Sequence, residues 1–577
     1  MSSVTVRIAG ANGDGVESSG ALVLNVAAKN GLQAYGYRGY QSIIRGGHVW
    51  YQIRIGDAAE KLQSHGEKID MLVALNQDAV NNQASHLNDG ACVIYDPTKT
   101  KVDAIDPKKY KLIPLPMLDI AIQVSGDPIM RNVACIGTVL KLVGIEFSAF
   151  EKVIEQMFTR KGEKVVENNI KVGQKGYTLE GVETIYGLKA DGKPRYALDG
   201  NTAISIGAYA SGCKFYAAYP MTPASSILHW FAAHADRGAF FKQVEDELAA
   251  INIAIGAANA GVRAMCGTSG GGFSLMAEGL GLAGMLETPL VVVESQRTGP
   301  STGLPTKTEQ GDLLFIMHAS QGEFPRIVVA PRSVEESFYI ASEALNLADR
   351  YQCPVLIVMD LFISERIETI DEFDLDSIKI DRGKVVTSNP EPGRFKRYLY
   401  TEDGISPRAF PGTPGTEYVA PSDEHDEYGD LISDALSGVD KYVEVRRKMM
   451  KKRMTKIETM LKNESIFVPH VFNEGAECFF VTFGSSTEPV MEAVKLLKEK
   501  GHNIGVVSFN YLMPLDKAKT KAILSGKKLI DVEANYTAQL AQVIMMNTGI
   551  DIDDKILYYD GEAITGESIA ERAVPLM

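Results

Sequence analysis

Short apolar runs rich in β-branched residues alternate with segments of helical periodicity along most of the chain. The runs at 4–9, 289–294 and 354–360 have the length and composition of buried strands, and 18–29 has the periodicity of a helix. Strands that alternate with helices are typical of α/β proteins with parallel sheets. The pattern therefore predicts an α/β fold with mainly parallel sheets.

Two polar stretches interrupt this pattern. The first, 161–194, combines glycines with lysines, and the second, 389–438, is rich in proline, glycine and acidic residues without a sustained period. We interpret both as linkers between three α/β units. The predicted division of the chain is a first unit over 1–190, a second over 191–388, a linker with a basic helix over 389–465, and a third over 466–577.

The basic helix is expected at 441–462, where lysines and arginines dominate. One interpretation is a docking surface for an acidic partner. The other is a solvated helix that bridges two units, which is the more common use of a run of charge. The sequence assigns this helix no role.

Composition narrows the classes of function. With 59 basic and 73 acidic side chains the net charge is 59 − 73 = −14, which argues against general binding of DNA, RNA or an anionic membrane. No apolar run reaches the roughly 18 residues of a membrane span, and the start of the chain lacks the pattern of a signal peptide. We therefore expect a cytoplasmic protein.

Cysteines occur singly, and no Cys-x-x-Cys pair is present. This spacing argues against a disulfide framework, a zinc site, or an iron–sulfur cluster held by this chain alone. The six positions are Cys92, Cys135, Cys213, Cys266, Cys353 and Cys478.

A glycine loop follows the first predicted strand, with Gly10, Gly13 and Gly15 spaced as G-x-x-G-x-G. A strand, a glycine turn and the start of a helix can together bind an anion. A dinucleotide site, however, has the spacing G-x-G-x-x-G and an acidic residue at about the position where this chain has Arg38. Arg38 and Arg45 instead suit the phosphates of a large anionic carrier such as coenzyme A. Tight turns with surface arginines are an equally consistent interpretation.

Gly13-Asp14-Gly15 also matches the first half of the thiamine diphosphate motif, in which GDG is followed about 30 residues later by Asn-Asn. The Asn-Asn pairs of this chain, 81–82 and 168–169, lie far outside that spacing. We interpret the GDG sequence as a coincidence.

Candidate chemistry concentrates in the second unit. At 214–227 a predicted strand leads into a predicted helix, with Thr222 as N-cap and Pro223 at the first helical position. Such a start offers amide groups and a hydroxyl to an anion such as a carboxylate. By itself, the motif is more simply interpreted as a good helix cap.

Three acids, Glu245, Asp246 and Glu247, open the next predicted helix. Acids in a first turn usually complement the helix dipole. Glu247, however, is in phase with Ile251 and Ile255, so its carboxyl should lean along the apolar face and be partly desolvated. A partly desolvated carboxyl suits a proton donor or relay.

Two further segments follow strands of this unit. The glycines at 270–272 precede a helix expected at 274–286, and three successive glycines suggest close approach by a ligand or another chain. The loop 295–306 follows the strand at 289–294, at the strand end where open α/β sheets bind ligands. Its Arg297 can bind a carboxylate through two hydrogen bonds, although a solvated surface arginine is the plainer interpretation.

Together, these motifs resemble a known family. Tyr-Pro-Met-Thr-Pro at 219–223, Glu-Asp-Glu-Leu-Ala-Ala at 245–250 and Gln-Arg-Thr-Gly-Pro-Ser-Thr-Gly-Leu-Pro-Thr at 296–306 are similar to the α subunit of 2-oxoacid:ferredoxin oxidoreductases. The first unit resembles that family's γ domain, and the last unit resembles its transketolase-like C-terminal domain. Within the family, the 296–306 loop looks most like enzymes acting on 2-oxoglutarate, or on 2-oxoacids broadly.

The resemblance implies a thiamine diphosphate enzyme that releases CO2 from a 2-oxoacid, passes electrons to ferredoxin and forms an acyl-coenzyme A. The fold it implies has a γ domain, a pyrimidine-type domain that binds thiamine diphosphate, and a transketolase C-terminal-like domain. By motif position, the resemblance implies that Glu247, or its rival Glu245, contacts the cofactor's aminopyrimidine and that Pro220 lies beside the cofactor. It implies that Thr222 and Arg297 bind the substrate's carboxylate and that Thr306 recognises the distal end of the substrate. The residues that it places at coenzyme A are Gly10, Gly13, Gly15, Arg38 and Arg45.

The motifs that this chain lacks predict a partner. A GDG…NN motif for diphosphate and Mg²⁺ and clustered cysteines for an electron path are both missing from the sequence. We therefore expect a β subunit that carries thiamine diphosphate, Mg²⁺ and a [4Fe–4S] cluster, in a two-fold assembly of αβ pairs. The alternatives are an enzyme specialised for pyruvate, branched-chain or aryl 2-oxoacids, and a non-catalytic organising subunit. A nucleotide-dependent dehydrogenase is weaker, because its fingerprint is absent.

Overall fold

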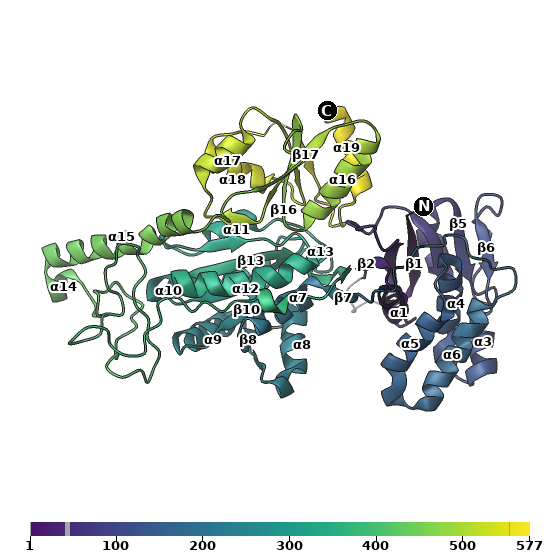
Figure 1. Ribbon diagram of the computed structural model, residues 1–577, viewed down its shortest axis with the longest axis horizontal. Helices are drawn as coiled ribbons and strands as arrows, with labels where there is room; N and C mark the ends of the chain where they lie inside the picture. Colours follow the sequence, from purple (N-terminus) through teal and green to yellow (C-terminus); the bar gives the residue numbers. More distant parts are fainter. Residues whose placement is uncertain (1, 41–46, 553) are drawn as a thin grey trace.

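The computed structural model describes residues 2–40, 47–552 and 554–577. These residues form three sheets, of eight, seven and five strands, each with helices packed against it. Figure 1 shows three lobes and a helical arm that extends from the middle lobe, with the first lobe at the opposite end of the molecule. The predicted α/β fold class is confirmed, although the first sheet is mixed rather than mainly parallel.

The first sheet carries the N-terminal lobe. Its strand order is β6 (Lys111–Pro114), β5 (Leu87–Tyr95), β4 (Ile69–Ala74), β1 (Ser3–Ala11), β3 (His48–Gly56), β2 (Gln33–Gly39), β14 (Ile367–Ile370) and β7 (Tyr196–Asp199). Apolar side chains of β1 and β3 pack against the helices of this lobe: α1 (Val16–Lys29), α4 (Arg131–Val143), α5 (Phe147–Phe158) and α6 (Glu163–Tyr177).

The stretch 161–194 is not simply a linker, because α6 occupies much of it. The glycines that suggested a linker allow close packing between α6 and α4. A Cβ on Gly176 would lie under 3.0 Å from the carbonyl oxygen of Ala134, and one on Gly137 would meet the carbonyl oxygen of Gly173 in the same way. The sequence prediction failed here because packing glycines and linker glycines look alike in sequence.

The second sheet forms the middle lobe, in the order β18 (Tyr511–Met513), β12 (Ile327–Val329), β13 (Pro354–Asp360), β11 (Leu290–Gln296), β10 (Ala264–Thr268), β8 (Phe215–Ala218) and β9 (Phe240–Gln243). All neighbours are parallel except β18 and β12. One face packs against α7 (Gly200–Ala210), α8 (Ser225–Ala233) and α12 (Val334–Tyr351). The other packs against α9 (Glu247–Asn259), α10 (Gly270–Leu286) and α11 (Leu313–His318).

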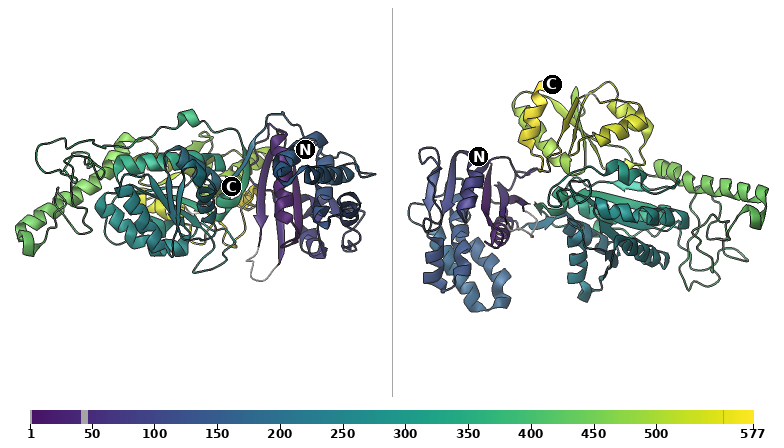
Figure 2. Two further views of the ribbon diagram at one scale, coloured as in Figure 1. Left: turned by 90° about the horizontal axis from the view of Figure 1, so that it is seen from below. Right: turned by 180° about the vertical axis from the view of Figure 1, so that it is seen from behind.

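The third sheet contains β15 (His470–Phe472), β17 (Ile504–Phe509), β16 (Cys478–Phe483), β19 (Lys528–Glu533) and β20 (Asp554–Leu557). α16 (Thr487–Glu499) and α19 (Gly566–Ala573) cover one face. Residues around α17 (Lys517–Leu524) and α18 (Gln539–Thr548) join the apolar core of the middle lobe. The middle and C-terminal lobes therefore share a core, as their contact in Figure 2 illustrates.

Strands cross between the lobes. β14 and β7 come from the middle part of the chain, yet β14 pairs with β2 and completes the sheet of the first lobe. β18 comes from the last part of the chain and pairs with β12 of the middle sheet. Pattern analysis of separate units does not reveal such pairings, because each strand is short and its partner is more than 150 residues away.

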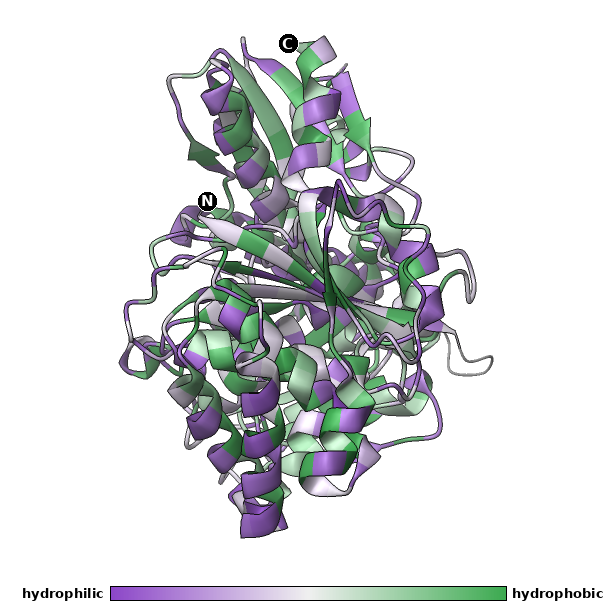
Figure 3. Ribbon diagram, turned by 90° about the vertical axis from the view of Figure 1, so that its right-hand side faces the viewer, coloured by the Kyte–Doolittle hydropathy of each residue, from purple (hydrophilic) through white to green (hydrophobic). Residues whose placement is uncertain are grey.

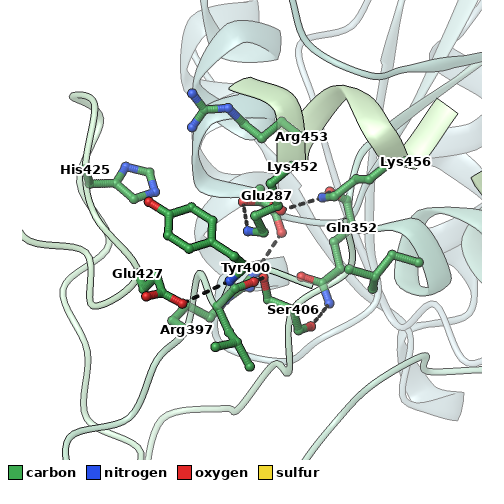
Figure 4. Close-up of polar contacts among 12 residues, drawn as sticks. Glu287, Gln352, Arg397, Tyr400, Ser406, His425, Glu427, Lys452, Arg453 and Lys456 are labelled. Atoms are coloured by element: carbon green, nitrogen blue, oxygen red, sulfur yellow. Dashed lines mark hydrogen bonds and ion pairs between the residues drawn. The ribbon is translucent and has the colours of Figure 1, made fainter. Parts of the chain in front are cut away.

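The arm contains the irregular segment before α14 (Asp434–Ser437) and the long helix α15 (Val439–Asn463). Lys452 and Lys456 of α15 are buried, and each Nζ lies 2.6 Å from a carboxylate oxygen of Glu287, which follows α10 (Figure 4). Arg453, also buried, binds Glu424 of the irregular segment. The interpretation as a solvated helix therefore holds for only part of it, because three of its basic side chains are buried and anchor it.

Hydropathy follows the same architecture. Figure 3 shows hydrophobic strands in the interior and alternating polar segments on the outer helices. Within the described parts of the chain, each helix is either too short or too polar to cross a membrane.

Candidate active site

Glu247 is the first residue of α9, and its side chain is buried with 3% of its surface exposed. Helix α9 starts two residues later than the first acid of the motif suggested, and Phe240–Gln243 form the edge strand β9. Asp246 is the N-cap and accepts a hydrogen bond from the Ala249 amide at 2.8 Å. Glu245 is exposed. The three crowded acids thus have distinct surroundings, and only Glu247 points into the protein.

Thr268, the last residue of β10, orients Glu247. Its hydroxyl donates a hydrogen bond to Oε1 of Glu247 at 3.2 Å. The three glycines lie inside α10, which begins at Gly270 rather than at 274. A Cβ on Gly272 would lie under 3.0 Å from both Thr268 Oγ1 and Glu247 Oε1, whereas one on Gly271 would have no neighbour within 4 Å. Gly272 is therefore required for the position of the Glu247 carboxyl.

Thr222 and Arg297 meet at the ends of β8 and β11. Arg297 donates from Nη1 to the carbonyl oxygen of Thr222 at 2.8 Å. In the described part of the chain Arg297 has no carboxylate partner within salt-bridge distance, and burial lowers the pKa of its guanidinium. Met221, next to Thr222, has its sulfur 3.7 Å from Thr268 Oγ1. Glu247, Thr268, Thr222 and Arg297 are thus one continuous group.

Thr222 is not a helix cap, which corrects the sequence expectation. Helix α8 begins at Ser225, after a turn, and its N-cap is Ala224. The turn is held instead by Asn201, which donates to the carbonyl oxygen of Pro223 at 2.8 Å. Pro220 is exposed, one residue before Met221.

The loop after Arg297 is closed at its base and attached to the C-terminal lobe. The Thr298 amide donates to the Lys307 carbonyl oxygen at 3.0 Å, and the Thr308 amide donates to that of Gly561 at 3.2 Å. The Gln310 amide donates to the carbonyl oxygen of Ala534 at 2.6 Å. Thr306 is half-buried within this closed loop. The C-terminal lobe therefore fixes the far end of the Arg297 loop.

A hollow of about 630 Å³ opens beside the glycine loop of the first lobe. Gly13, Gly15 and Arg38 line it, whereas Gly10, the second-last residue of β1, is not among its lining residues. Arg38 already contacts two carboxylates, those of Glu17 and Glu365. Arg45 lies outside the described residues.

Asp14 occupies the centre of the glycine loop. Its Oδ2 accepts a hydrogen bond from the Ala11 amide at 2.8 Å, and its Oδ1 lies 2.7 Å from Arg131 Nη2. The middle residue of the GDG sequence therefore holds the loop together through contacts within this lobe.

Sequence reasoning missed Thr268, which contacts Glu247, and two buried or partly buried acids of the same lobe, Glu294 and Asp312. Glu294 lies within β11 and is fully buried. Burial and nearby Glu309 raise the pKa of Asp312 to about 6. An acid in the apolar run Val-Val-Val-Glu was the signal for Glu294. Thr268 and Asp312 carried none, because sheet register and loop packing bring them to the site.

The described residues contain no cluster of three or more His, Cys, Asp or Glu side chains that could hold a metal ion. Their cysteines are unpaired, and all but the half-buried Cys478 are buried.

Comparison with known proteins covers nearly the whole chain. Residues 206–444 match the family described as pyruvate flavodoxin/ferredoxin oxidoreductase, thiamine diP-bdg. Residues 5–179 match pyruvate ferredoxin/flavodoxin oxidoreductase, and 470–554 match the transketolase C-terminal domain.

Individual proteins match over similar lengths. The 2-oxoacid:ferredoxin oxidoreductase subunit alpha of Sulfolobus sp. is 34% identical over 99% of this chain and 96% of its own. The 2-oxoglutarate oxidoreductase subunit KorA of Mycobacterium tuberculosis is 29% identical over 96% and 88%. A solved structure of 2-oxoglutarate:ferredoxin oxidoreductase from Magnetococcus marinus, with 2-oxoglutarate, coenzyme A and succinyl-CoA bound, superimposes with a TM-score of 0.90, at 31% identity and over 99% of both chains.

Proposed function

The chain belongs to the 2-oxoacid:ferredoxin oxidoreductases, as an α subunit, and from this membership we propose that its enzyme acts on 2-oxoglutarate. The proposed reaction converts 2-oxoglutarate and coenzyme A to succinyl-CoA and CO2 and transfers two electrons to ferredoxin. The substrates bound by the Magnetococcus marinus enzyme and the names of the KorA relatives support this choice.

Arg297 carries the proposal. Its guanidinium is partly buried and lacks a carboxylate partner among the described residues. One of its N–H groups donates a hydrogen bond to the carbonyl oxygen of Thr222. Its remaining donors suit the two oxygens of a substrate carboxylate. Thr222 lies beside it and would contact the same carboxylate. We assign Thr306, on the same closed loop, to the distal end of the substrate.

The residues around Glu247 fit thiamine diphosphate. When bound, this cofactor supplies the carbon nucleophile for decarboxylation of the 2-oxoacid. Glu247 would hold a proton at Oε2 and bond a ring nitrogen of the aminopyrimidine, since Oε1 is held by Thr268. The absent side chain at Gly272 leaves room for the Glu247 carboxyl itself, and the space at Gly271 is open. Pro220 is exposed and follows the carboxyl end of β8, and we assign it to the same cofactor.

The hollow beside the glycine loop is the proposed contact for coenzyme A. Its volume of about 630 Å³ is within the range of pockets for large ligands. Gly13 and Gly15 leave the backbone accessible there. Arg38 would bind a phosphate only if one of its two carboxylate contacts is exchanged for it. Arg45 is assigned to the same site from its sequence position.

We assign the remaining components to other subunits. A β subunit would hold the diphosphate, Mg²⁺ and a [4Fe–4S] cluster, and two αβ pairs would form a two-fold assembly that reduces ferredoxin. The designation of the relatives as subunit alpha supports a second subunit.

The test is co-purification of the chain with its β subunit, followed by measurement of coenzyme A-dependent ferredoxin reduction. We expect a higher kcat/KM with 2-oxoglutarate than with pyruvate. Arg297→Ala should lower kcat/KM by about 100-fold, since a charge-assisted carboxylate contact contributes a few kcal/mol. Arg237→Ala is the control, because this exposed arginine of the same lobe makes no ion pair with the described residues. Higher activity with pyruvate would refute the substrate assignment. Unchanged turnover in Arg297→Ala would favour an organising subunit.

A further inference from the structure

Gln310 lies at the end of the loop after Arg297, and only 1% of its surface is exposed. Its backbone amide donates to the carbonyl oxygen of Ala534 at 2.6 Å. Its Oε1 accepts hydrogen bonds from the Ser486 hydroxyl at 2.8 Å and from the Ala534 amide at 3.0 Å, and its Nε2 donates to the carbonyl oxygen of Phe483 at 3.3 Å. Gln310 is therefore bonded to the C-terminal lobe through both its backbone and its side chain.

The C-terminal lobe reaches back to the same place. Asn535 donates from Nδ2 to the carbonyl oxygen of Gln310 at 3.2 Å. Gln539, the first residue of α18, donates to the carbonyl oxygen of Gly311 at 2.6 Å and accepts from the Leu314 amide at 2.9 Å. Asn535 and Gln539 are both buried. Buried amides with satisfied hydrogen bonds hold one arrangement firmly, because alternatives leave polar groups unpaired.

The first half of the loop is supported by the middle lobe. Arg297 directly follows β11 and donates to the carbonyl oxygen of Thr222 at 2.8 Å. The residue before it, Gln296, is buried at the end of β11 and donates to the carbonyl oxygen of Met359 at 3.2 Å. Arg297 is thus placed by contacts within the middle lobe, and the loss of the Gln310 side chain should leave it in position.

The second half of the loop, 303–309, contains Thr306 and lies outside the named helices and strands of the described structure. Thr308 is bonded from both lobes, because its amide donates to the Gly561 carbonyl oxygen at 3.2 Å and its hydroxyl accepts a hydrogen bond at 3.2 Å from the amide of Phe362 in the middle lobe. The buried bonds two residues further on add to the share of the C-terminal lobe. The position of the second half therefore depends largely on that lobe.

We propose that Gln310 is a positioning residue for the distal end of the substrate, through which the C-terminal lobe sets the preference for 2-oxoacids with a second carboxylate. The inference rests on the proposed function, in which Arg297 binds the carboxylate common to all 2-oxoacids and Thr306 contacts the distal end. A loop attached at Gln310 presents Thr306 at a fixed place, whereas a loosened loop must be ordered when the substrate binds. Only a substrate that reaches Thr306 meets that ordering cost.

The experiment compares two substrates in the assembled αβ complex. Gln310→Ala removes the side-chain bonds and keeps the backbone ones. Its kcat/KM for 2-oxoglutarate should fall about tenfold through KM, with kcat within about twofold, because uniform binding rather than chemistry is affected. Its kcat/KM for pyruvate, which has no distal carboxylate, should stay within about twofold of wild type. Where pyruvate turns over too slowly, its inhibition constant against 2-oxoglutarate replaces kcat/KM.

Gln352→Ala is the matched control. Gln352 is a middle-lobe glutamine that is also 1% exposed, and its Nε2 donates to the carbonyl oxygen of Ser406 at 2.7 Å. Thermal unfolding should show a loss of stability at least as large as that of Gln310→Ala, whereas the preference for 2-oxoglutarate over pyruvate should remain that of the wild type. A purely structural role of Gln310 predicts the same kinetics for both variants.

An unchanged preference in Gln310→Ala, or an equal change in Gln352→Ala, overturns the proposal. Should Gln310→Ala not assemble, Ser486→Ala decides, since it removes one hydrogen bond to the Gln310 side chain. A preference for 2-oxoglutarate lowered about threefold in that variant supports the proposal, and the wild-type preference overturns it. Failure of the proposed function is a different result: a wild-type complex with higher kcat/KM for pyruvate, whatever the variants do.

Discussion

The geometry around Glu247 depends on single small residues. Gly272 faces the Glu247 carboxyl and the Thr268 hydroxyl, whereas its neighbour Gly271 faces open space. The two glycines are adjacent in one helix and have the same intrinsic helix propensity. Any difference between their alanine variants therefore reports the contact with Glu247.

Gly272→Ala should lower kcat about 100-fold or more, because a displaced Glu247 carboxyl misaligns the site. Gly271→Ala should stay within about twofold. Circular dichroism and thermal unfolding should show that both variants fold. Equal kinetics of the two variants would contradict the requirement for a glycine at 272.

At the residue scale, the sequence predicted side-chain burial correctly where it depends on the periodicity of a single helix. The phase of Glu247 with Ile251 predicted its burial, because both lie on one helical face. It failed for Thr222, where a turn replaces the expected cap. It could not find Thr268, because parallel strand register is set by tertiary packing rather than by local sequence.

Among the elements, α15 differs most from its predicted environment. Its bounds, Val439–Asn463, are close to the predicted 441–462. The burial of Lys452 and Lys456 was not predicted, because their partner Glu287 is distant in sequence and follows a different helix. A charge run indicates a helix but not which of its charges face water.

Glu287→Gln should lower the free energy of unfolding by about 3–5 kcal/mol, since it leaves two buried lysines without their carboxylate. Chemical denaturation followed by circular dichroism measures this loss. Glu444→Gln on α15 is the control, because Glu444 and Lys448 form an exposed pair that should contribute under about 1 kcal/mol. Equal losses in both variants would contradict the anchoring role.

Stability should also depend on pH through Lys452, whose pKa burial lowers from 10.5 to about 7. Between these values the unfolded lysine carries a proton that the folded one lacks, so the unfolded state binds more protons. The free energy of unfolding should therefore rise as pH increases from 7 towards 10. Lys452→Met should flatten this dependence, and identical slopes in both proteins would refute it.

At the scale of the whole molecule, Arg366 joins the three lobes. It is fully buried and donates to Glu368 of β14 and to Glu488 of α16, both at 2.6 Å. Its guanidinium lies over the rings of Phe362 and Tyr35, at 4.8 and 5.5 Å from their centroids. The side chain therefore contacts elements that belong to all three sheets or their helices.

Arg366→Met should cost about 3–5 kcal/mol, because Glu368 and Glu488 lose their shared cation. We expect the calorimetric unfolding transition to broaden or split, as the C-terminal lobe loosens. Lys495→Ala removes an exposed pair between the first and last lobes and should change little. An unaltered transition in Arg366→Met would show that the shared apolar core alone couples the lobes.

The eight-stranded sheet has a consequence for dividing the chain. If the chain were divided near residue 190, β2 would become an unpaired edge strand of the N-terminal fragment. The C-terminal fragment would contain β14, the strand that pairs with β2 in the intact protein. Two such pieces, produced separately, should recognise each other by strand addition and reconstitute the complete protein in trans.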